Sequence, residues 1–181
     1  AKFLSLSGQV ARLTAELAGQ PVRFSEELAR EAPEVVRAET TLMAARREQL
    51  EAQLAILRDQ RRQRQQELAD LRNKAAMLDQ QLGLVQEQLR ILEPLALEGL
   101  APRVDVIRAQ RELAQTQTDL SSARLQIPRA EAALQEADRK IEERQATFRA
   151  DAQKELNERR TQLEGATELT ASDRDRVRRT E

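Results

Sequence analysis

Apolar residues recur along most of the chain with alternating spacings of three and four, which is typical of a coiled-coil seam. Before residue 98 the seam positions are Val36, Thr40, Met43, Arg47, Leu50, Leu54, Leu57, Arg61, Arg64, Leu68, Leu71, Ala75, Leu78, Leu82, Val85, Leu89, Leu92 and Ala96. After residue 102 they are Val106, Ala109, Leu113, Thr116, Leu120, Ala123, Ile127, Ala130, Leu134, Ala137, Ile141 and Phe148. The pattern predicts two long helices.

The two series match each other across the break at residues 98–102. If the chain reverses at Gly99, facing residues have numbers that sum to about 201, as in any antiparallel pair. Leu92 then lies opposite Ala109, and such large-against-small layers alternate with layers in which both residues are leucine. That alternation fills the space between two helices without voids. The sequence therefore predicts an all-α fold, a long antiparallel coiled-coil helical hairpin with an additional short N-terminal helix.

Glycine, proline and serine residues indicate where these elements begin and end. Gly19 is suited to end the first helix, Pro33 to begin the second, and Ser25 to start a helical turn in the intervening linker. The predicted segments are a short helix over 1–19, a linker over 20–32, an ascending long helix over 33–98, a tip over 99–102, a descending long helix over 103–170, and an exit segment over 171–181.

Two irregularities interrupt the descending helix. Pro128 removes a backbone hydrogen bond inside it and is expected to bend it. The apolar phase slips after Phe148 and resumes at Leu156 and Leu163, which predicts a stutter in the coiled coil.

Charged residues also enter the seam as it approaches the chain ends. The predicted polar layers contain Arg47, Arg61, Arg64, Arg144 and Glu155. The register places Arg47 opposite Glu155, and it places Arg64 opposite Ala137. A charge in a core layer costs stability, and its best-attested role is to fix the register or the partner of a helix.

Composition narrows the class of protein. Charged residues make up 34% of the chain and aromatic residues 2%, which suits a two-helix seam better than a globular core. The absence of cysteine and histidine excludes disulfides, thiol chemistry and the usual zinc sites. With a net charge of −1 and few aromatic residues, nucleic-acid binding is not expected.

No residue of the chain is a convincing candidate for catalysis, cofactor binding or metal binding. The pairs Glu26–Glu27 and Glu142–Glu143 lack the cleft that would raise the pKa of one carboxylate. We therefore expect a protein that is not an enzyme and has no cofactor. No apolar run approaches the ~18 residues that a membrane-spanning helix requires, and the first residues do not resemble a signal peptide.

The break between the two long helices is the best candidate for a functional site. Gly99 and Pro102 suit a turn between helices, but three leucines also gather there, with no core expected beneath them. We interpret the tip as a docking site for a partner protein. Its candidate residues are Leu95, Leu97, Glu98, Gly99, Leu100, Ala101, Pro102 and Arg103.

Several stretches resemble the HlyD-type membrane fusion proteins, the periplasmic adaptors of type I secretion systems. They are LEGLAPRVDVIRAQREL at 97–113, IPRAEAALQEADRKIEE at 127–143, FRADAQKELNE at 148–158 and DRVRRTE at 175–181. Their order is more specific than any single coiled-coil segment, and the resemblance covers nearly the whole chain.

The resemblance implies a non-enzymatic periplasmic adaptor anchored to the inner membrane. It implies that the hairpin bridges an inner-membrane ABC transporter to a TolC-type outer-membrane channel, which the tip contacts. It further implies a homo-oligomer, expected to be a hexamer, and a missing lipoyl-like domain after Thr180-Glu181.

Two alternatives remain open from the sequence. The first is the adaptor of a multidrug efflux pump, whose tips carry an Arg, Leu and Ser pattern. Leu95 fits that pattern, but Ile91 falls at the Arg position and Pro102 replaces the Ser, which favours the protein-secretion branch. The second alternative is a cytosolic coiled-coil tether.

Overall fold

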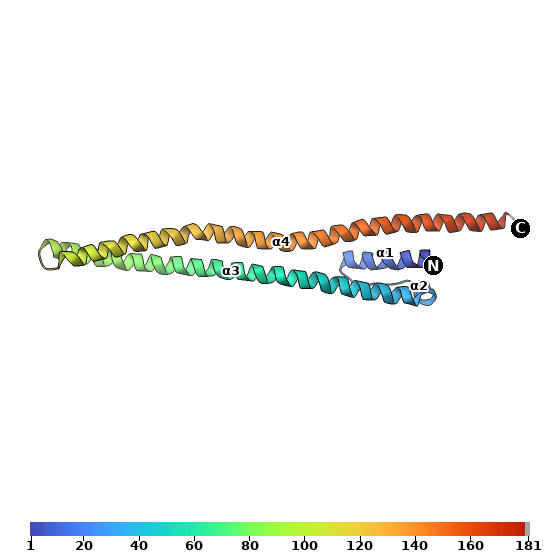
Figure 1. Cartoon of the computed structure of the whole chain (residues 1–181), viewed down its shortest axis with the longest axis horizontal. Helices are drawn as coiled ribbons and strands as arrows, with labels where there is room; N and C mark the ends of the chain where they lie inside the picture. Colours follow the sequence, from blue (N-terminus) through green and yellow to red (C-terminus); the bar gives the residue numbers. More distant parts are fainter. Residues whose placement is uncertain (180–181) are drawn as a thin grey trace. The chain divides into compact units, whose positions relative to one another are not determined.

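The computed structural model describes residues 1–179, and all regular secondary structure in that range is helical. The elements are α1 (Lys2–Ala18), α2 (Glu26–Glu31), α3 (Pro33–Leu97) and α4 (Arg103–Arg178) (Figure 1). The predicted all-α helical hairpin with a short N-terminal helix is confirmed. The helix α4 continues to Arg178 and so includes most of the predicted exit segment over 171–181, for which the sequence left open both extension of the helix and departure from it. Thr180 and Glu181, expected to lead into a further domain, lie outside the described residues.

Contacts divide the chain into two compact units. The turn unit comprises Leu57–Lys140 and contains the reversal between α3 and α4. The terminal unit comprises Ala1–Ile56 with Ile141–Glu181, of which residues up to 179 are described. Because α3 and α4 each contribute to both units, the same two helices can be followed in two different environments.

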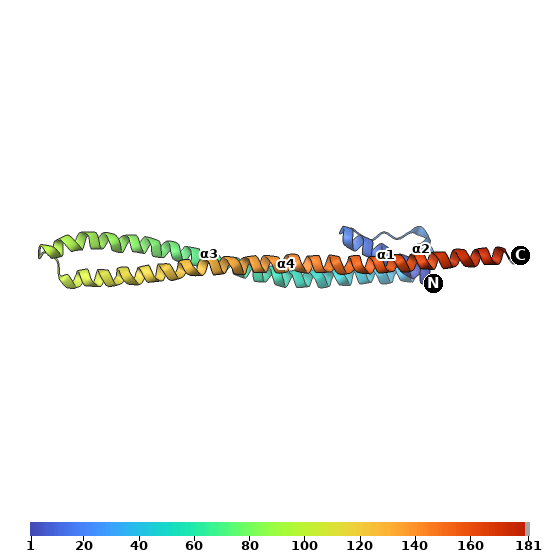
Figure 2. The same ribbon diagram turned by 90° about the horizontal axis from the view of Figure 1, so that it is seen from above.

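In the turn unit, α4 returns beside α3 (Figure 2). The seam is built as the periodicity predicts, since its apolar positions are buried or half-buried and the residues between them are mostly exposed. Its most buried side chains are Leu68, Val85, Leu89, Ala109, Thr116, Leu120, Ala123 and Ala137. Burial therefore follows one narrow stripe on each helix.

Ion pairs between the two helices define the register of the turn unit. An Arg72 nitrogen lies 3.1 Å from a Glu131 oxygen, and an Arg124 nitrogen lies 3.2 Å from an Asp79 oxygen. The two residue numbers in each pair sum to 203, close to the sum of about 201 that an antiparallel seam reversing at Gly99 requires. The predicted register agrees with these contacts.

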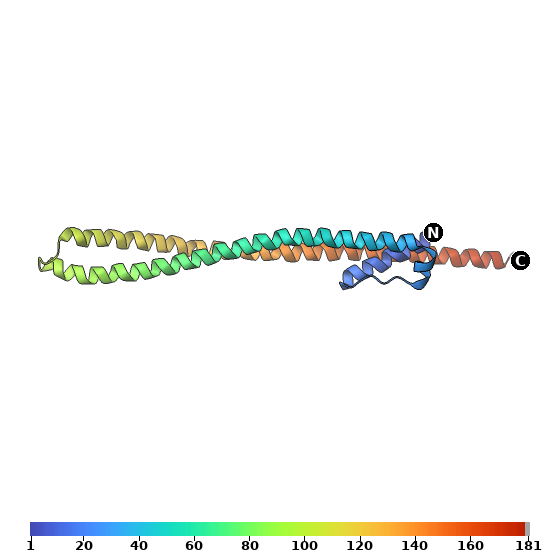
Figure 3. The same cartoon turned by 90° about the horizontal axis from the view of Figure 1, so that it is seen from below.

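In the terminal unit, α1 packs against both long helices (Figure 3). Leu13 of α1 forms a small core with Ala152 and Leu156 of α4. On its other side α1 approaches α3 so closely that a Cβ atom at Gly8 would lie 2.6 Å from Cγ1 of Val35. The terminal unit is thus a three-helix packing, which the hairpin pattern alone did not predict.

Local sequence explains where α1 ends and where α2 begins. Gly19 follows α1 with a φ of 65°, and the Gln20 amide donates to the Ala15 carbonyl at 3.1 Å, a glycine-based C-cap. The Leu28 amide donates to Oγ of Ser25 at 3.2 Å, so the expected helical turn of the linker forms as α2. These caps place Leu28 in the interior of the terminal unit, where it is buried.

Both prolines that lie within the long helices are accommodated without ending them. Pro94 lies within α3 and Pro128 within α4. The sequence analysis singled out only Pro128, and the helix continues on both sides of it. Among residues 1–179, none of the helices combines the length and apolar character that crossing a membrane requires.

Candidate functional site

The turn between α3 and α4 is closed by backbone hydrogen bonds around a left-handed glycine. Gly99 has a φ of 74°, a conformation that side chains with a Cβ atom rarely adopt. The Gly99 amide donates to the Ala96 carbonyl at 3.1 Å, and the Leu100 amide donates to the Leu95 carbonyl at 2.8 Å. These two bonds form a Schellman motif, which satisfies carbonyls at the end of α3.

The new helix begins directly after Pro102. The Asp105 amide donates to the Pro102 carbonyl at 3.1 Å, and Asp105 lies in the first turn of α4, where a carboxylate favours the helix dipole. Backbone hydrogen bonds therefore close both helix ends at the turn.

The apolar side chains of the turn face solvent. Leu97 is 90% exposed and Leu100 is 70% exposed, while Leu95 is 36% exposed. Of the other predicted tip residues, Ala101 is half-buried, and Glu98, Gly99, Pro102 and Arg103 are exposed. The predicted tip residues are thus adjacent in one turn that offers leucines to an external surface.

Two further apolar residues of the tip were missed by the sequence analysis. Val104 is 61% exposed and Ile107 is 42% exposed, both in the first turns of α4. Both lie outside the seam positions Val106 and Ala109, so an apolar residue away from the seam is the signal that identifies them.

The predicted polar layers have different environments in the two units. In the turn unit, Arg61 pairs with Asp138 at 3.7 Å, with both side chains substantially exposed. Arg64 is exposed and pairs with Glu67 on its own helix at 3.0 Å. Such pairs contribute little, because water and salt screen them.

In the terminal unit, the predicted layer of Arg47 and Glu155 requires correction. Glu155 pairs with Arg46 at 3.3 Å and with Arg12 at 3.5 Å, while Arg47 is exposed. At two layers of α3 the inward residue is therefore one position earlier than predicted, because Glu39 is buried where Thr40 was expected and Arg46 lies inward in place of Arg47. Met43 and Leu50, between and after these layers, are half-buried as predicted. Packing of α1 on this face explains the shift, since its Arg12 supplies a partner for the inward carboxylates.

Arg144, the remaining predicted polar residue, also joins the two helices. Its Nε donates to Oε1 of Gln53 at 2.6 Å, and both side chains are half-buried. The partner is a neutral amide, so this layer provides hydrogen-bond specificity without a second charge.

Five charged residues meet inside the terminal unit and form what we call the charge cluster: Arg12, Glu16, Glu39, Arg46 and Glu155. Arg12 is 1% exposed, and its guanidinium lies 2.6 Å from Glu39 and 3.0 Å from Glu16. Arg46 lies 3.2 Å from Glu16 and 5.7 Å from the centre of the Phe148 ring, which adds a cation–π contact.

The charge cluster keeps Arg12 charged despite its burial. Burial alone would lower the pKa of Arg12, but its hydrogen bond to Glu39 and the charge of Glu16 outweigh this, and the pKa is raised. The sequence analysis identified only Glu155 of the five. The available signal was the spacing of Arg12 and Glu16, four residues apart on a helix. That helix also carries an apolar stripe, formed by Leu6, Val10, Leu13 and Leu17.

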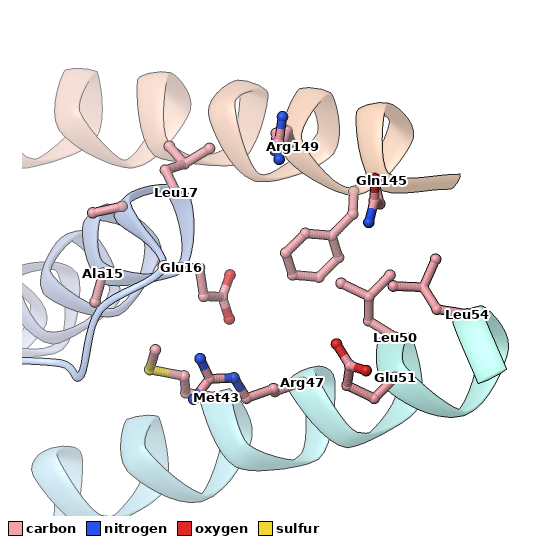
Figure 4. Close-up of a pocket in the computed structure, with 13 residues that line it drawn as sticks. Ala15, Glu16, Leu17, Met43, Arg47, Leu50, Glu51, Leu54, Gln145 and Arg149 are labelled. Atoms are coloured by element: carbon pink, nitrogen blue, oxygen red, sulfur yellow. The ribbon is translucent and has the colours of Figure 1, made fainter. Parts of the chain in front are cut away.

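A cavity of about 480 Å³ lies beside this cluster, where side chains of α1, α3 and α4 converge (Figure 4). It is lined by Ala15, Glu16, Leu17, Ala18, Gly19, Met43, Arg47, Leu50, Glu51, Leu54, Gln145, Phe148 and Arg149. This lining contains no serine, threonine, lysine or tyrosine. The cavity therefore offers a mixed apolar and charged surface, whose carboxylates are those of Glu16 and Glu51. Within residues 1–179 no group of three or more acidic, histidine or cysteine side chains is arranged to hold a metal ion.

Comparisons with known proteins agree with this architecture. The chain is similar to the soluble domain of LipC, a membrane fusion protein of a type I secretion system, with a TM-score of 0.83 and 22% sequence identity. The similarity covers 96% of this chain and 84% of the LipC chain. No curated protein sequence matches.

The family of this chain is shown by its match to a protein-family model. The model described as the long α-helical hairpin of AprE matches residues 1–176, which is nearly the whole chain. The resemblance to the helical hairpin of HlyD-type membrane fusion proteins, predicted from the sequence, is thereby confirmed. The chain belongs to the AprE long α-helical hairpin family.

Proposed function

We propose that this chain is the helical hairpin of an adaptor in a type I secretion system. Its family and its similarity to a membrane fusion protein support the adaptor role. In this role the hairpin bridges an inner-membrane ABC transporter to an outer-membrane channel of the TolC type, within the periplasm. The function is mechanical, because the hairpin joins two other proteins and carries out no reaction of its own.

The observation that carries this proposal is the exposure of leucines on a turn that backbone hydrogen bonds close. Leu97 and Leu100 are among the most exposed large apolar residues of the described chain, yet backbone bonds of Gly99 and the Leu100 amide close the turn. Apolar anchors at the centre of a small contact can supply much of its binding energy. The tip is therefore suited to dock on the rim of a channel protein.

Several copies of the adaptor are expected around one export path. A seam of two helices buries one stripe of each, so much of the remaining surface is available to neighbouring copies. We propose a homo-oligomer, with a hexamer as the expected size.

The tip is tested by Leu100→Asp in the full-length adaptor. A carboxylate at this position would have to be desolvated without a partner on docking, so we expect export of the cargo protein to be lost. The turn should still fold, because changes at exposed sites typically alter stability by no more than ~0.5 kcal/mol. A secretion assay measures export, co-purification of the outer-membrane channel measures docking, and a circular dichroism melt measures stability.

The matched control is Ile56→Asp, which places the same charge at a 61% exposed apolar residue outside the tip. Export should survive this control. Normal export by a well-expressed Leu100→Asp protein would show that the loop is only a turn.

A further inference from the structure

The charge cluster of the terminal unit contains more carboxylates than guanidinium groups. Its members are two arginines, Arg12 and Arg46, and three glutamates, Glu16, Glu39 and Glu155. When all five side chains are ionised, the cluster carries one negative charge in excess. A charge held away from water is stable only when it is paired and hydrogen-bonded. The cluster therefore favours the approach of one further cation.

Glu16 is the member of the cluster that a further cation can reach. Its side chain is 4% exposed, and its Oε1 lies 3.0 Å from Nη1 of Arg12 and 3.2 Å from Nε of Arg46. Its Oε2 is buried and has no hydrogen-bond partner among residues 1–179. Glu16 also lines the cavity of about 480 Å³, and its carboxylate points into the space between α1, α3 and α4 (Figure 4). One oxygen of a buried carboxylate is thus left to a group inside the cavity.

The remaining walls of the cavity suit an organic cation. The last turn of α1 lines it and carries no basic residue, so the partial negative charge at this helix end is not compensated within that turn. The Phe148 ring, which lies 5.7 Å from the Arg46 guanidinium, also lines the cavity, and aromatic rings attract cations. Met43, Leu50 and Leu54 add apolar surface on which an alkyl stem can pack. The volume lies within the range of about 300–1,000 Å³ that is typical of small-molecule sites.

Two arginines on the cavity wall limit the charge of what binds. Arg47 and Arg149 are exposed, and neither forms an ion pair with Glu16 in the part of the chain that the structure describes. Their guanidinium groups repel a second positive charge on a ligand. The cavity therefore favours a monovalent cation over a divalent metal ion or a polyamine.

We propose that this cavity binds a monovalent organic cation, an alkylguanidinium or alkylammonium group. Its head pairs with Oε2 of Glu16, and its stem lies along the apolar wall. A small free amine and an arginine or lysine side chain of another polypeptide both offer this chemistry. Because the cavity is lined by α1, α3 and α4, an occupant holds these three helices together and stabilises the terminal unit. The site lies wholly in the terminal unit and does not depend on the proposed docking at the tip.

The test is the binding of n-butylguanidinium to the full-length adaptor, measured by ligand-observed saturation-transfer NMR. The compound n-butanol has the same stem without the charge. Glu16→Gln removes the buried charge and keeps the shape of the side chain. Its matched control is Glu142→Gln, which removes an exposed carboxylate of α4 that does not line the cavity. Circular dichroism establishes that each variant is folded.

A second variant keeps the test decisive if Glu16→Gln does not fold. Met43→Lys retains an unbranched stem at a half-buried position of the cavity wall and brings its own ammonium group into the cavity. That ammonium group should compete with the probe. Met43→Leu is its control, because it changes the stem without adding a charge.

We expect saturable binding of n-butylguanidinium that is about ten-fold or more tighter than that of n-butanol, as a hydrogen bond to a charged group warrants. Glu16→Gln and Met43→Lys should each weaken binding by a similar factor, while the two control variants should leave it unchanged. No saturable binding, equal binding of n-butanol, equal weakening by Glu16→Gln and Glu142→Gln, or unchanged binding by Met43→Lys would each overturn the proposal.

The source of the cation is tested with a blocked tripeptide that has a central arginine between two glycines. Tighter binding of this peptide than of n-butylguanidinium supports the proposal with a polypeptide side chain as the occupant. Weaker binding of the peptide, with n-butylguanidinium still bound, supports it with a small free cation as the occupant.

Discussion

The two compact units contain parts of the same two long helices, yet charged side chains are exposed in one unit and buried in the other. In the turn unit, the pair of Arg72 with Glu131 is about half exposed on both sides. In the terminal unit, Arg12 and the carboxylate of Glu16 are almost completely buried. The difference is the presence of α1, which covers the seam in one unit and is absent from the other. A third helix converts weak surface ion pairs into an internal cluster whose integrity affects folding.

The largest expected effect comes from breaking the charge cluster. Arg12→Met would leave the carboxylates of Glu39 and Glu16 buried with one arginine fewer, and loss of one partner from a buried ion pair costs about 3–5 kcal/mol. Urea denaturation followed by circular dichroism should detect a loss of this size in the transition that unfolds the terminal unit.

The control for this prediction lies in the turn unit. Arg72→Met removes an exposed pair with Glu131 and should cost less than about 1 kcal/mol. Similar losses for the two variants would mean that burial by α1 does not distinguish the units.

Two glycines sharpen the comparison with effects of opposite sign. Gly8→Ala places a methyl group 2.6 Å from Cγ1 of Val35, so the Val35 side chain or α1 must shift, and such overpacking typically costs about 1–3 kcal/mol. Gly83→Ala, within α3 of the turn unit, meets no atom within 4 Å. Because alanine favours a helix over glycine by about 1 kcal/mol, this variant should be more stable than the unsubstituted chain. Thermal melts should show a lower melting temperature for Gly8→Ala and a higher one for Gly83→Ala than for the unsubstituted chain. A stabilising Gly8→Ala would contradict the close packing of α1.

The sequence predicted the turn unit well for a physical reason. Two helices that bury only one another leave a strict seven-residue period, which is readable from positions such as Leu78, Val85 and Leu92. The Schellman turn at Gly99 was readable too, since a left-handed residue after a helix is usually glycine. Exposure of the tip followed from its place beyond the end of the seam.

The terminal unit was predicted less well because its packing depends on residues far apart in the sequence. The apolar stripe of α1 indicates that one face is buried, but it does not identify the surface that covers it. Glu39 and Arg46 resemble solvent-facing residues when α3 is considered alone. Their side chains lie inward because they form ion pairs with Arg12 and Glu16 of α1. The predicted seam position of Arg47 was therefore wrong by one residue.

Hydrogen exchange along α3 tests most directly whether α1 makes the terminal unit different. We predict that amides near Glu39 and Arg46 exchange more slowly than amides near Lys74, although the first group lies closer to the start of the helix, where fraying normally accelerates exchange. In Gly8→Ala this extra protection should fall while the turn unit keeps its own rate. Equal protection of the two regions in the unsubstituted chain, or faster exchange near Glu39, would contradict the account.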